Sequence, residues 1–456
     1  MSQSEASKVP KTGFVIEHSR PAEDASSSTL QWQAEPEKLA LRPGYTVGKC
    51  IGKGGVAEVF AAELRRPPLP PQRVALKRLL PGLRNDPAQQ RKLRREAQIG
   101  ATLSHDNIVR TLELIDLGDE VALALELVDG LPAQRLLRLL TEHGYRLRPP
   151  LVGHILHGIF SALDYLQRLT PQQRPLVHAD LSLENVMLAR DGGVRLIDFG
   201  LSAETSGSDE EASGTDDVLT ALHEVGGKPS YLPPEGTTRI PTVTRDLYAA
   251  GVCAWELLTG RRFPVLPKGT TSRELGSLVA FAATGQPAPV WLLLRDSLAL
   301  LPTQRLRSAE EGLTRCAQLL RGHPTDAALA RLVRSLQTES PDWTPPEPLL
   351  PQLAPFDAAV DLVDRLRQSF VAAHVEVFAF DDASSGFLSR AKKGQGRTLA
   401  AEPVLLDALQ NGVASEDGVL CLRLRAAGGD RVVVIDPGEG RCYSPVTKTL
   451  LTNILS

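Results

Sequence analysis

The sequence predicts an α+β protein with a strand-rich first part, a helical middle part and a smaller α/β domain at the C-terminal end. Strand-like apolar segments around a glycine cluster fill residues 45–79. Helical periodicity dominates from residue 130 to about 337. Helix and strand patterns alternate again after a proline-rich stretch at 341–355. At 456 residues the chain has room for two or three domains.

The composition is typical of a soluble globular protein, with 42% hydrophobic and 23% charged residues. Lys plus Arg total 51 against 54 Asp plus Glu, a formal net charge of −3 that does not suggest a nucleic-acid or anionic-membrane partner. The five cysteines are odd in number and lack a C-x-x-C pair, which predicts a reducing compartment rather than disulfides or zinc. The N-terminus has no apolar core of the kind that a signal peptide needs, which predicts a cytoplasmic protein. Gly and Pro interrupt the most apolar window, 275–294, so no membrane span is predicted there.

The first part of the chain contains a predicted tail, a sheet and a helix. Residues 1–40 are rich in Ser, Glu and Ala and are predicted to be a disordered tail. Strands are predicted over "YTVGKCIGKGG", "AEVFAAEL" and "RVALKRLL". The stretch "RPPLPPQ" (66–72) is expected to be a rigid connection between strands, with an SH3 ligand as the alternative. A helix is predicted over 86–104, capped by Asp86 and with Pro87 at its first position.

Glycines gather in "IGKGGVAEVF", where Gly52, Gly54 and Gly55 lie between two predicted strands. A backbone without Cβ atoms can approach a phosphate closely and offer its N–H groups. The motif alone is weak evidence because glycine turns are common in hairpins. Ala57 replaces the third glycine of G-x-G-x-x-G, and a P-loop is excluded because no helix and no G-K-[ST] follow.

Charged residues follow this loop in an informative order. "VALK" places Lys77 on the next strand, and Glu96 follows nineteen residues later within the predicted helix. A Lys–Glu pair there would hold the ammonium against the phosphates of a nucleotide, whereas the alternative is two solvated surface charges.

A second group of polar residues combines the spacing His178-x-Asp180-x-x-x-x-Asn185 with "IDFG", which contains Asp198. Asp180 could orient an attacking hydroxyl and accept its proton. Asn185 and Asp198 carry hard oxygen ligands that suit Mg²⁺, and they are the candidate metal ligands.

With these residues the chain resembles the protein kinase family, specifically bacterial kinases of the eukaryotic Ser/Thr type. The resemblance implies a bilobal fold with a small β-rich N-lobe and a helical C-lobe, ATP and Mg²⁺ as cofactors, and a protein substrate. It extends from residue 45 to about 320 and covers, in the family's order, the glycine loop (52–57), "VALK" (74–77), Glu96, "SHDNIV" (104–109), "HADLSLEN" (178–185), "DFG" (198–200), "YLPPE" (231–235), "RDLYAAGVCAWELLTG" (245–260) and "PTQRLRSAEE" (302–311).

The resemblance also implies roles for individual residues. Residues 126–128 would form the hinge that binds the adenine edge, and Leu125 would be the gatekeeper. Glu235 would pair with Arg305, and Asp246 would hold the backbone of the catalytic loop. The implied nucleotide-binding set is Ile51, Gly52, Lys53, Gly54, Gly55, Val59, Ala75, Lys77, Glu96, Leu125, Glu126 and Val128.

Three positions depart from the family pattern. Ala179 stands where the family usually has the Arg that grips an activation-loop phosphate, and Ser182 stands where the Ser/Thr branch has Lys. Lys228 occupies the usual Thr position of "GGKPSYLPPE". Our hypothesis is that the cation has moved, so that Lys228 supplies the charge and Ser182 the hydroxyl; the alternative is that Lys228 points to solvent. The candidate catalytic residues are therefore Lys77, Asp180, Ser182, Asn185 and Lys228.

Two other functions stay open within this fold. A pseudokinase acting as a nucleotide-binding scaffold is less favoured, because Lys77, Asp180, Asn185 and Asp198 are all present. A small-molecule phosphotransferase is less favoured, because such enzymes usually lack the "PPE" segment found here. The acidic segment 203–218 is expected to be a solvated loop, with phosphorylation of its Ser and Thr residues as the alternative.

The remaining domain boundaries follow from composition. A kinase domain over 45–320 is followed by a trailing helix over 321–340 and the proline-rich linker over 341–355. Residues 356–456 are expected to form a small α/β domain whose order of elements resembles a GAF-type sensor domain. A regulatory role and a possible homodimer through this domain are the corresponding expectations.

Overall fold

The computed structural model covers most of the chain, but the predicted disordered tail (1–40) and all but two residues of the acidic segment 203–218 lie outside the described residues. The ranges that the structure describes are 44–116, 120–169, 175–200, 203–204, 228–235, 242–337, 343–355, 358–381, 386–394, 402–416, 419–424, 430–438 and 441–455.

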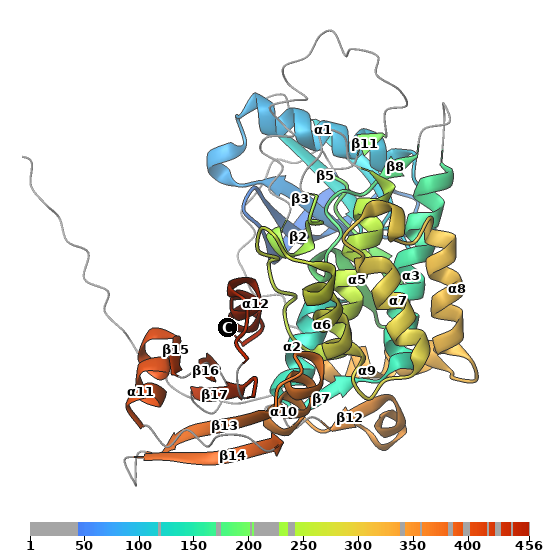
Figure 1. Ribbon diagram of the computed structural model, residues 1–456. Helices are drawn as coiled ribbons and strands as arrows, with labels where there is room; N and C mark the ends of the chain where they lie inside the picture. The colour runs from blue at the N-terminus through green and yellow to red at the C-terminus, as the bar shows by residue number, and fades with distance from the viewer. Residues whose placement is uncertain are drawn as a thin grey trace, which may run out of the picture.

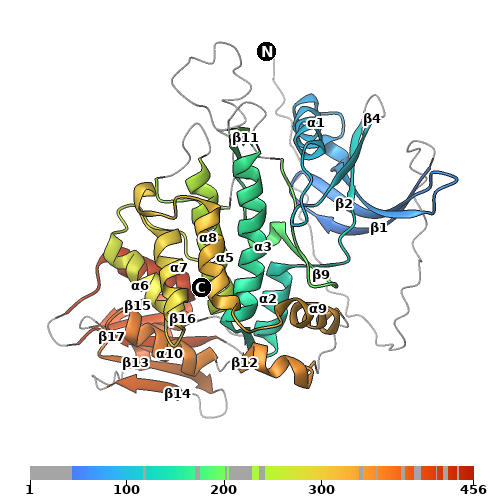
Figure 2. The ribbon, with the colours of Figure 1, turned by 90° about the vertical axis from the view of Figure 1, so that its right-hand side faces the viewer.

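The N-lobe is a five-stranded antiparallel sheet in the order β1-β2-β3-β5-β4, with helix α1 packed beside it (Figure 2). As predicted, α1 begins at Pro87, and the Asp86 side chain accepts a hydrogen bond from the Ala88 N–H at 2.8 Å. The bounds are β1 Tyr45–Lys53, β2 Ala57–Leu64, β3 Gln72–Leu79, η1 Pro81–Leu83, α1 Pro87–Ala101, β4 Thr111–Asp116 and β5 Val121–Glu126.

The C-lobe is a helical layer around α5, which is buried from Arg245 to Thr259 because α3, α6 and α7 pack around it (Figure 1). Its helices are α2 Ala133–Glu142, α3 Pro149–Arg168, α5 Val243–Thr259, α6 Ser272–Ala283, α7 Ala288–Leu298, α8 Ala309–Leu320 and α9 Thr325–Leu336, with η2 Leu183–Asn185, η3 Pro229–Tyr231 and η4 Pro302–Gln304. Its short strands are β6 Gly130–Pro132, β7 Tyr145–Leu147, β8 Leu176–Val177, β9 Val186–Ala189, β10 Val194–Leu196 and β11 Ala203–Glu204.

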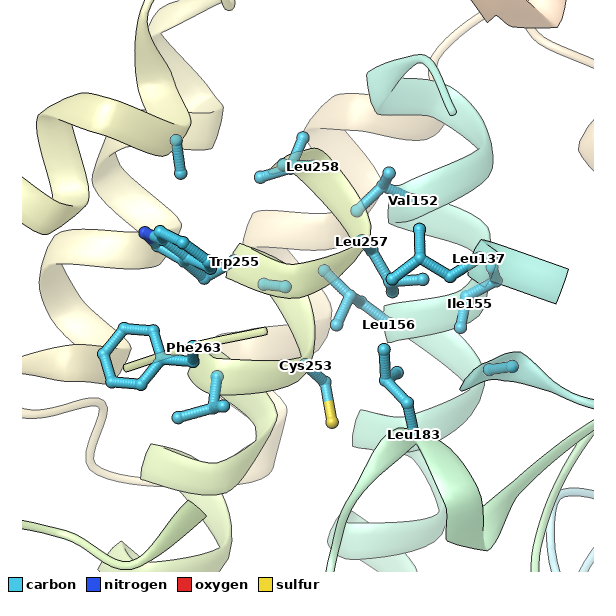
Figure 3. Packing of buried hydrophobic residues seen from close by; sticks show 14 of the residues in the cluster. Leu137, Val152, Ile155, Leu156, Leu183, Cys253, Trp255, Leu257, Leu258 and Phe263 are labelled. Atoms are coloured by element: carbon cyan, nitrogen blue, oxygen red, sulfur yellow. The ribbon is translucent and has the colours of Figure 1, made fainter. Parts of the chain in front are cut away.

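The loop of residues 178–185, which the family resemblance implies is the catalytic loop, is attached to the C-lobe core. Leu183 is fully buried and lies beside Leu156 of α3 and Leu257 of α5 (Figure 3). On the far side of α5, Trp255 stacks on Phe281 and donates from its indole N–H to the Leu278 carbonyl at 2.7 Å. Because close-packed cores transmit small displacements, this arrangement gives the catalytic loop a rigid support.

The proline-rich stretch is more ordered than a free linker. It forms η5 Glu347–Gln352 and β12 Leu353–Pro355, and β12 pairs antiparallel with β7 of the C-lobe. Leu349 and Leu353 are buried in the same hydrophobic cluster as the C-lobe helices. The stretch that the sequence predicts to be an interdomain linker thus packs against the C-lobe.

The C-terminal domain is a five-stranded antiparallel sheet in the order β14-β13-β17-β16-β15. Its elements are α10 Ala358–Ser369, β13 His374–Asp381, β14 Gly386–Gly394, α11 Glu402–Asn411, β15 Val413–Glu416, β16 Val419–Leu424, β17 Arg431–Asp436 and α12 Pro445–Leu455. In β17, Val432 and Val434 belong to a cluster with α11, whereas Val433 and Ile435 belong to the cluster that includes α10, α12 and the C-lobe. The sheet is thus covered on both faces, and α10 and α12 join it to the C-lobe (Figure 1).

The apolar window at 275–294 forms parts of α6 and α7, as the prediction of a buried helix plus loop required. Among the residues described, none of the helices combines the length and apolar character needed to cross a membrane.

Candidate functional site

Lys77, Glu96 and Asp198 meet between the lobes, each from a different element. The Lys77 ammonium on β3 lies 2.8 Å from both carboxylate oxygens of Glu96 on α1 and 3.0 Å from Asp198 Oδ1, which follows β10. Burial alone would lower the pKa of Lys77, but the two carboxylates outweigh burial and raise it. The ammonium is therefore charged across the physiological pH range, and the alternative of two solvated surface charges is wrong.

Asp180 and Asn185 are joined within the catalytic loop. The Asn185 amide Nδ2 donates to the Asp180 carbonyl at 2.8 Å and to its carboxylate Oδ2 at 3.0 Å. Burial, together with the nearby charge of Asp198, raises the pKa of Asp180 above its ordinary value, although Lys228 opposes the rise. The Ile197 N–H donates to the Asn185 carbonyl at 3.0 Å, so the chain directly before Asp198 is joined to this loop.

Asp246 holds the backbone of the catalytic loop from below. Its carboxylate accepts hydrogen bonds from the His178 N–H at 2.7 Å and the Ala179 N–H at 2.9 Å. Ala179 adopts a left-handed conformation with φ of 67°, which is unfavourable for a residue with a Cβ. Arg245 Nη2 also donates to the Ala179 carbonyl at 2.8 Å, so three hydrogen bonds maintain this conformation directly before Asp180.

Lys228 points into the site rather than toward solvent. Its ammonium donates to Ser182 Oγ at 2.7 Å and lies 2.9 Å from Glu184 Oε2. Lys228 and Asp180 line the same small pocket, and the positive charge of Lys228 lowers the pKa of Asp180. The structure thus brings together Lys228 and Ser182, which are 46 positions apart.

The ion pair expected under the activation segment is present. The Arg305 guanidinium makes two parallel hydrogen bonds of 2.6 Å to the Glu235 carboxylate, a bidentate geometry that fixes orientation. The Arg305 side chain is fully buried and lies over the Tyr248 ring. Its location supports the structural role implied for this pair.

The glycine loop is a tight connection between β1 and β2, in which the Gly54 N–H donates to the Ala57 carbonyl at 2.8 Å. A Cβ at Gly52 or Gly54 would meet only ordinary van der Waals contacts, and nothing lies within 4 Å of such an atom at Gly55. The packing of the chain itself therefore does not require glycine at these three positions.

The other predicted nucleotide-site residues lie on the N-lobe strands and the segment after β5. Ile51 and Lys53 are exposed on β1, and Val59 is half-buried on β2. Ala75 is buried on β3 and is paired with Leu125 of β5, where Glu126 ends the strand and Val128 follows it.

Sequence reasoning missed several residues that support the site. Tyr231 donates to the fully buried Glu256 at 2.5 Å and accepts from the Leu183 N–H at 3.4 Å. Arg262 lies 3.3 Å from Glu184 Oε1. The sequence offered a hint only for Tyr231, which lies within the "YLPPE" motif, because the other contacts depend on packing between segments far apart in the chain.

The bilobal arrangement and this cluster define a protein of the kinase fold. The family profile for the protein kinase domain matches residues 45–283, more than half of the chain, so the chain belongs to this family. It is 35% identical over 232 residues to the probable serine/threonine-protein kinase SCO3848 of Streptomyces coelicolor, covering 50% of this chain and 31% of that protein.

Two further similarities are of the same kind. The chain is 32% identical over 274 residues to the serine/threonine-protein kinase PrkC of Bacillus subtilis, covering 59% of this chain and 39% of that protein. The chain thus spans about a third of the length of these relatives. A crystal structure of the Mycobacterium tuberculosis PknI kinase domain has a TM-score of 0.45 at 24% identity and covers 63% of this chain and 100% of that one.

Proposed function

We propose that this protein is a Ser/Thr protein kinase that transfers the γ-phosphate of ATP to a Ser or Thr hydroxyl of a protein substrate. The observation that carries this proposal is the cluster of Lys77, Glu96 and Asp198, which is joined to the Asp180–Asn185 pair by the hydrogen bond from the Ile197 N–H to the Asn185 carbonyl. Its relatives bear the names of Ser/Thr protein kinases, which supports the choice of acceptor.

The nucleotide fits the residues present. Cβ atoms at Gly52, Gly54 and Gly55 would meet at most ordinary contacts within the chain, so the packing does not explain these glycines. In this proposal, glycine is needed because a backbone without Cβ atoms can approach the polyphosphate closely. In this proposal Lys77 contacts the phosphates, Val59 packs over the adenine ring, and the backbone of 126–128 binds its edge. The full set is the one predicted above, from Ile51 to Val128.

Asn185 and Asp198 would hold Mg²⁺, since their oxygens are the hard ligands this ion prefers. Mg²⁺, when bound, neutralises charge on the transferring phosphoryl group. Asp180 orients the acceptor hydroxyl and takes its proton, and the Asn185 amide keeps the carboxylate in place for this task. Placement and charge neutralisation supply most of the catalysis, because phosphoryl transfer needs little covalent help.

Lys228 and Ser182 would replace the missing lysine of the catalytic loop. The contact of 2.7 Å between the Lys228 ammonium and Ser182 Oγ supports this exchange of a cation and a hydroxyl between two segments. The Lys228 charge also opposes the effect of burial on Asp180, which keeps that carboxylate ionised to lower pH.

Lys228→Met is expected to lower the turnover number about tenfold to a hundredfold. This fall is smaller than that expected when a buried transition-state contact is lost, because Lys228 is partly exposed. Removing its charge raises the pKa of Asp180, so the acid limb of the pH–rate profile should move to higher pH. Lys228→Arg should keep the limb in place. These values are obtained from initial rates of protein phosphorylation between pH 5 and 8.

Lys393→Met serves as the matched control, because this lysine lies on β14, is half exposed and pairs with Asp364 at 3.3 Å. Turnover and pH profile of Lys228→Met equal to those of this control would contradict the proposed role.

The function itself is tested by incubating the purified chain with radiolabelled ATP, Mg²⁺ and a Ser/Thr-rich protein, followed by phosphosite mapping. Phosphoserine or phosphothreonine should form, and Asp198→Ala should reduce incorporation at least a hundredfold, as expected for loss of a charge-neutralising contact. Nucleotide binding without turnover would indicate a pseudokinase. Phosphate found only on added small molecules would indicate the other phosphotransferase class.

The C-terminal domain is proposed to be regulatory or sensory. Support for a GAF-type relationship is limited to the order helix, two strands, helix, three strands, helix. A homodimer through this domain is supported by Leu406 and Val413, apolar residues exposed on α11 and on the edge strand β15. A bacterial source and a cytoplasmic location belong to the same proposal.

A further inference from the structure

The first part of the connection between α5 and α6, residues 260–267 (the 260–267 loop), lies between the catalytic loop and the C-terminal domain. It contains two consecutive arginines whose side chains contact opposite partners. Arg261 Nη1 donates to the Ile454 carbonyl of α12 at 3.4 Å. Arg262 Nη2 lies 3.3 Å from Glu184 Oε1 in the catalytic loop. Two consecutive residues, Arg261 and Arg262, therefore contact the C-terminal domain and the catalytic loop respectively.

On the catalytic side, Glu184 is held between two cations. One carboxylate oxygen faces Arg262, and the other faces the Lys228 ammonium at 2.9 Å. Burial opposes its ionisation, but Lys228 and Arg262 outweigh burial and lower the pKa of Glu184. Because Lys228 also donates to Ser182, Arg262 orients the carboxylate that places Lys228 beside Asp180.

The same loop has a second, buried attachment to the catalytic loop. The Phe263 N–H donates to Glu256 Oε1 at 2.9 Å, and Phe263 itself is buried against Trp255. Tyr231 donates to the other oxygen of Glu256 and accepts from the Leu183 N–H. A displacement of the loop backbone would therefore reach the catalytic loop through a fully buried carboxylate as well.

On the other side, α12 contacts both the loop and the helix that follows it. Asn453 Nδ2 donates to the Val265 carbonyl at 3.2 Å. At the first turn of α6, the Glu274 carboxylate accepts hydrogen bonds from Ser444 at 2.7 Å and Thr447 at 3.0 Å. Glu274 is also part of the capping box of α6, so the beginnings of the two helices share one carboxylate.

The C-terminal domain packs against the C-lobe through buried contacts, in addition to the chain that connects them. Arg365 of α10 is buried and donates to the carbonyls of Phe281 at 2.5 Å and Ala282 at 3.1 Å, at the end of α6. Its Nε donates to Asp361 at 2.6 Å, which provides the compensating charge. One hydrophobic cluster contains residues of α10, α12 and the C-lobe helices. The helices α10 and α12 are thus part of the same hydrophobic core as the C-lobe helices.

We propose that the C-terminal domain positions the catalytic loop through the 260–267 loop, with Arg262 and Asn453 as positioning residues. This inference rests on the kinase function proposed above and deepens it. When α12 is seated, the loop presents Arg262 to Glu184, and Lys228 stays on Ser182. When α12 shifts, Glu184 is released on one side and competes with Ser182 for Lys228. The position of the C-terminal domain then sets the turnover number.

The test compares full-length Arg262→Gln, Asn453→Ala and the double variant by steady-state kinetics. Arg262→Gln should lower kcat about three- to fivefold, the range for a partly exposed ion pair, and Asn453→Ala about twofold. KM for ATP should not change, because Lys77 and Asp198 are untouched. Since both residues act through one loop, the double variant should be no slower than Arg262→Gln alone. Arg262→Lys should recover part of the loss.

Arg138→Gln is the matched control, because Arg138 on α2 is similarly exposed and has a partner, Glu142, at 3.6 Å. The inference would be overturned if the fold-reduction in kcat of the double variant equalled the product of the two single-variant reductions. A kcat of Asn453→Ala equal to that of the wild type would overturn it as well. Amide hydrogen exchange of residues 178–186 is the second readout, and it should be faster in both single variants but not in Arg138→Gln. If wild-type protein does not turn over, the proposed function fails, and this exchange measurement alone decides whether the positioning exists.

Discussion

Asp180→Asn is expected to lower the turnover number about 10²- to 10⁴-fold, the range for loss of a general base, while nucleotide affinity stays close to that of the wild type. Asparagine keeps the shape of the side chain and can still accept the Asn185 hydrogen bond, but it cannot take the proton of the acceptor hydroxyl. Single-turnover phosphorylation of a protein substrate measures the first quantity, and titration with a fluorescent ATP analogue measures the second.

The raised pKa of Asp180 adds a pH dependence to this prediction. Burial favours the protonated carboxyl, so wild-type activity should fall on the acid side at a higher pH than that of an ordinary aspartate. The Asp180→Asn variant should lose this acid limb. Asp164→Asn on α3, which removes an aspartate paired with Arg168, should leave rate and pH profile unchanged. Turnover of Asp180→Asn within threefold of that control would refute the role of Asp180.

Asp246→Ala is expected to lower the free energy of unfolding by about 2–6 kcal/mol, because it leaves two buried N–H groups, at roughly 1–3 kcal/mol each, without an acceptor. These are the N–H groups of His178 and Ala179. The left-handed Ala179 costs about 1–2 kcal/mol in the folded chain, so its conformation should relax when its support is removed. Thermal unfolding and the turnover number should both report the change.

Asp191→Ala provides the comparison for this prediction. Asp191 is exposed in the β9–β10 turn and accepts a single hydrogen bond, from the Gly193 N–H at 2.8 Å. Its removal should cost no more than about 1 kcal/mol and leave turnover intact. If Asp246→Ala is no less stable than Asp191→Ala, the catalytic loop does not depend on the buried carboxylate.

Two ion pairs of the candidate site could be predicted because their residues lie in recognisable local contexts. Lys77 follows an apolar strand pattern and Glu96 lies inside a capped helix, so their order along the chain indicates a pair, and the structure confirms it. The ion pair between Glu235 and Arg305 is confirmed in the same way. The partner of Lys228 was a hypothesis that departed from the family pattern, and the 2.7 Å contact with Ser182 agrees with it.

Other features could not be predicted because no local pattern encodes them. The short strand β12 consists of the last three residues of the proline-rich stretch, and its only strand partner among the described residues is β7, which lies more than 200 positions earlier in the chain. The edge strand β15 is four residues long, too short for a clear alternation of apolar and polar side chains. Arg262 looks like any exposed arginine until its neighbour Glu184 is known.

The sequence by itself determined the kinase family and the pairing of Lys77 with Glu96, because these depend on local periodicity and on motifs in a known order. Only the tertiary structure decided that the C-terminal domain docks on the C-lobe and that α12 contacts the 260–267 loop. Those contacts join residues 188 and 193 positions apart, such as Val265 with Asn453 and Arg261 with Ile454. The physical reason is that such pairings are selected by the packing of whole helices and sheets, and single side chains carry no local signal for them.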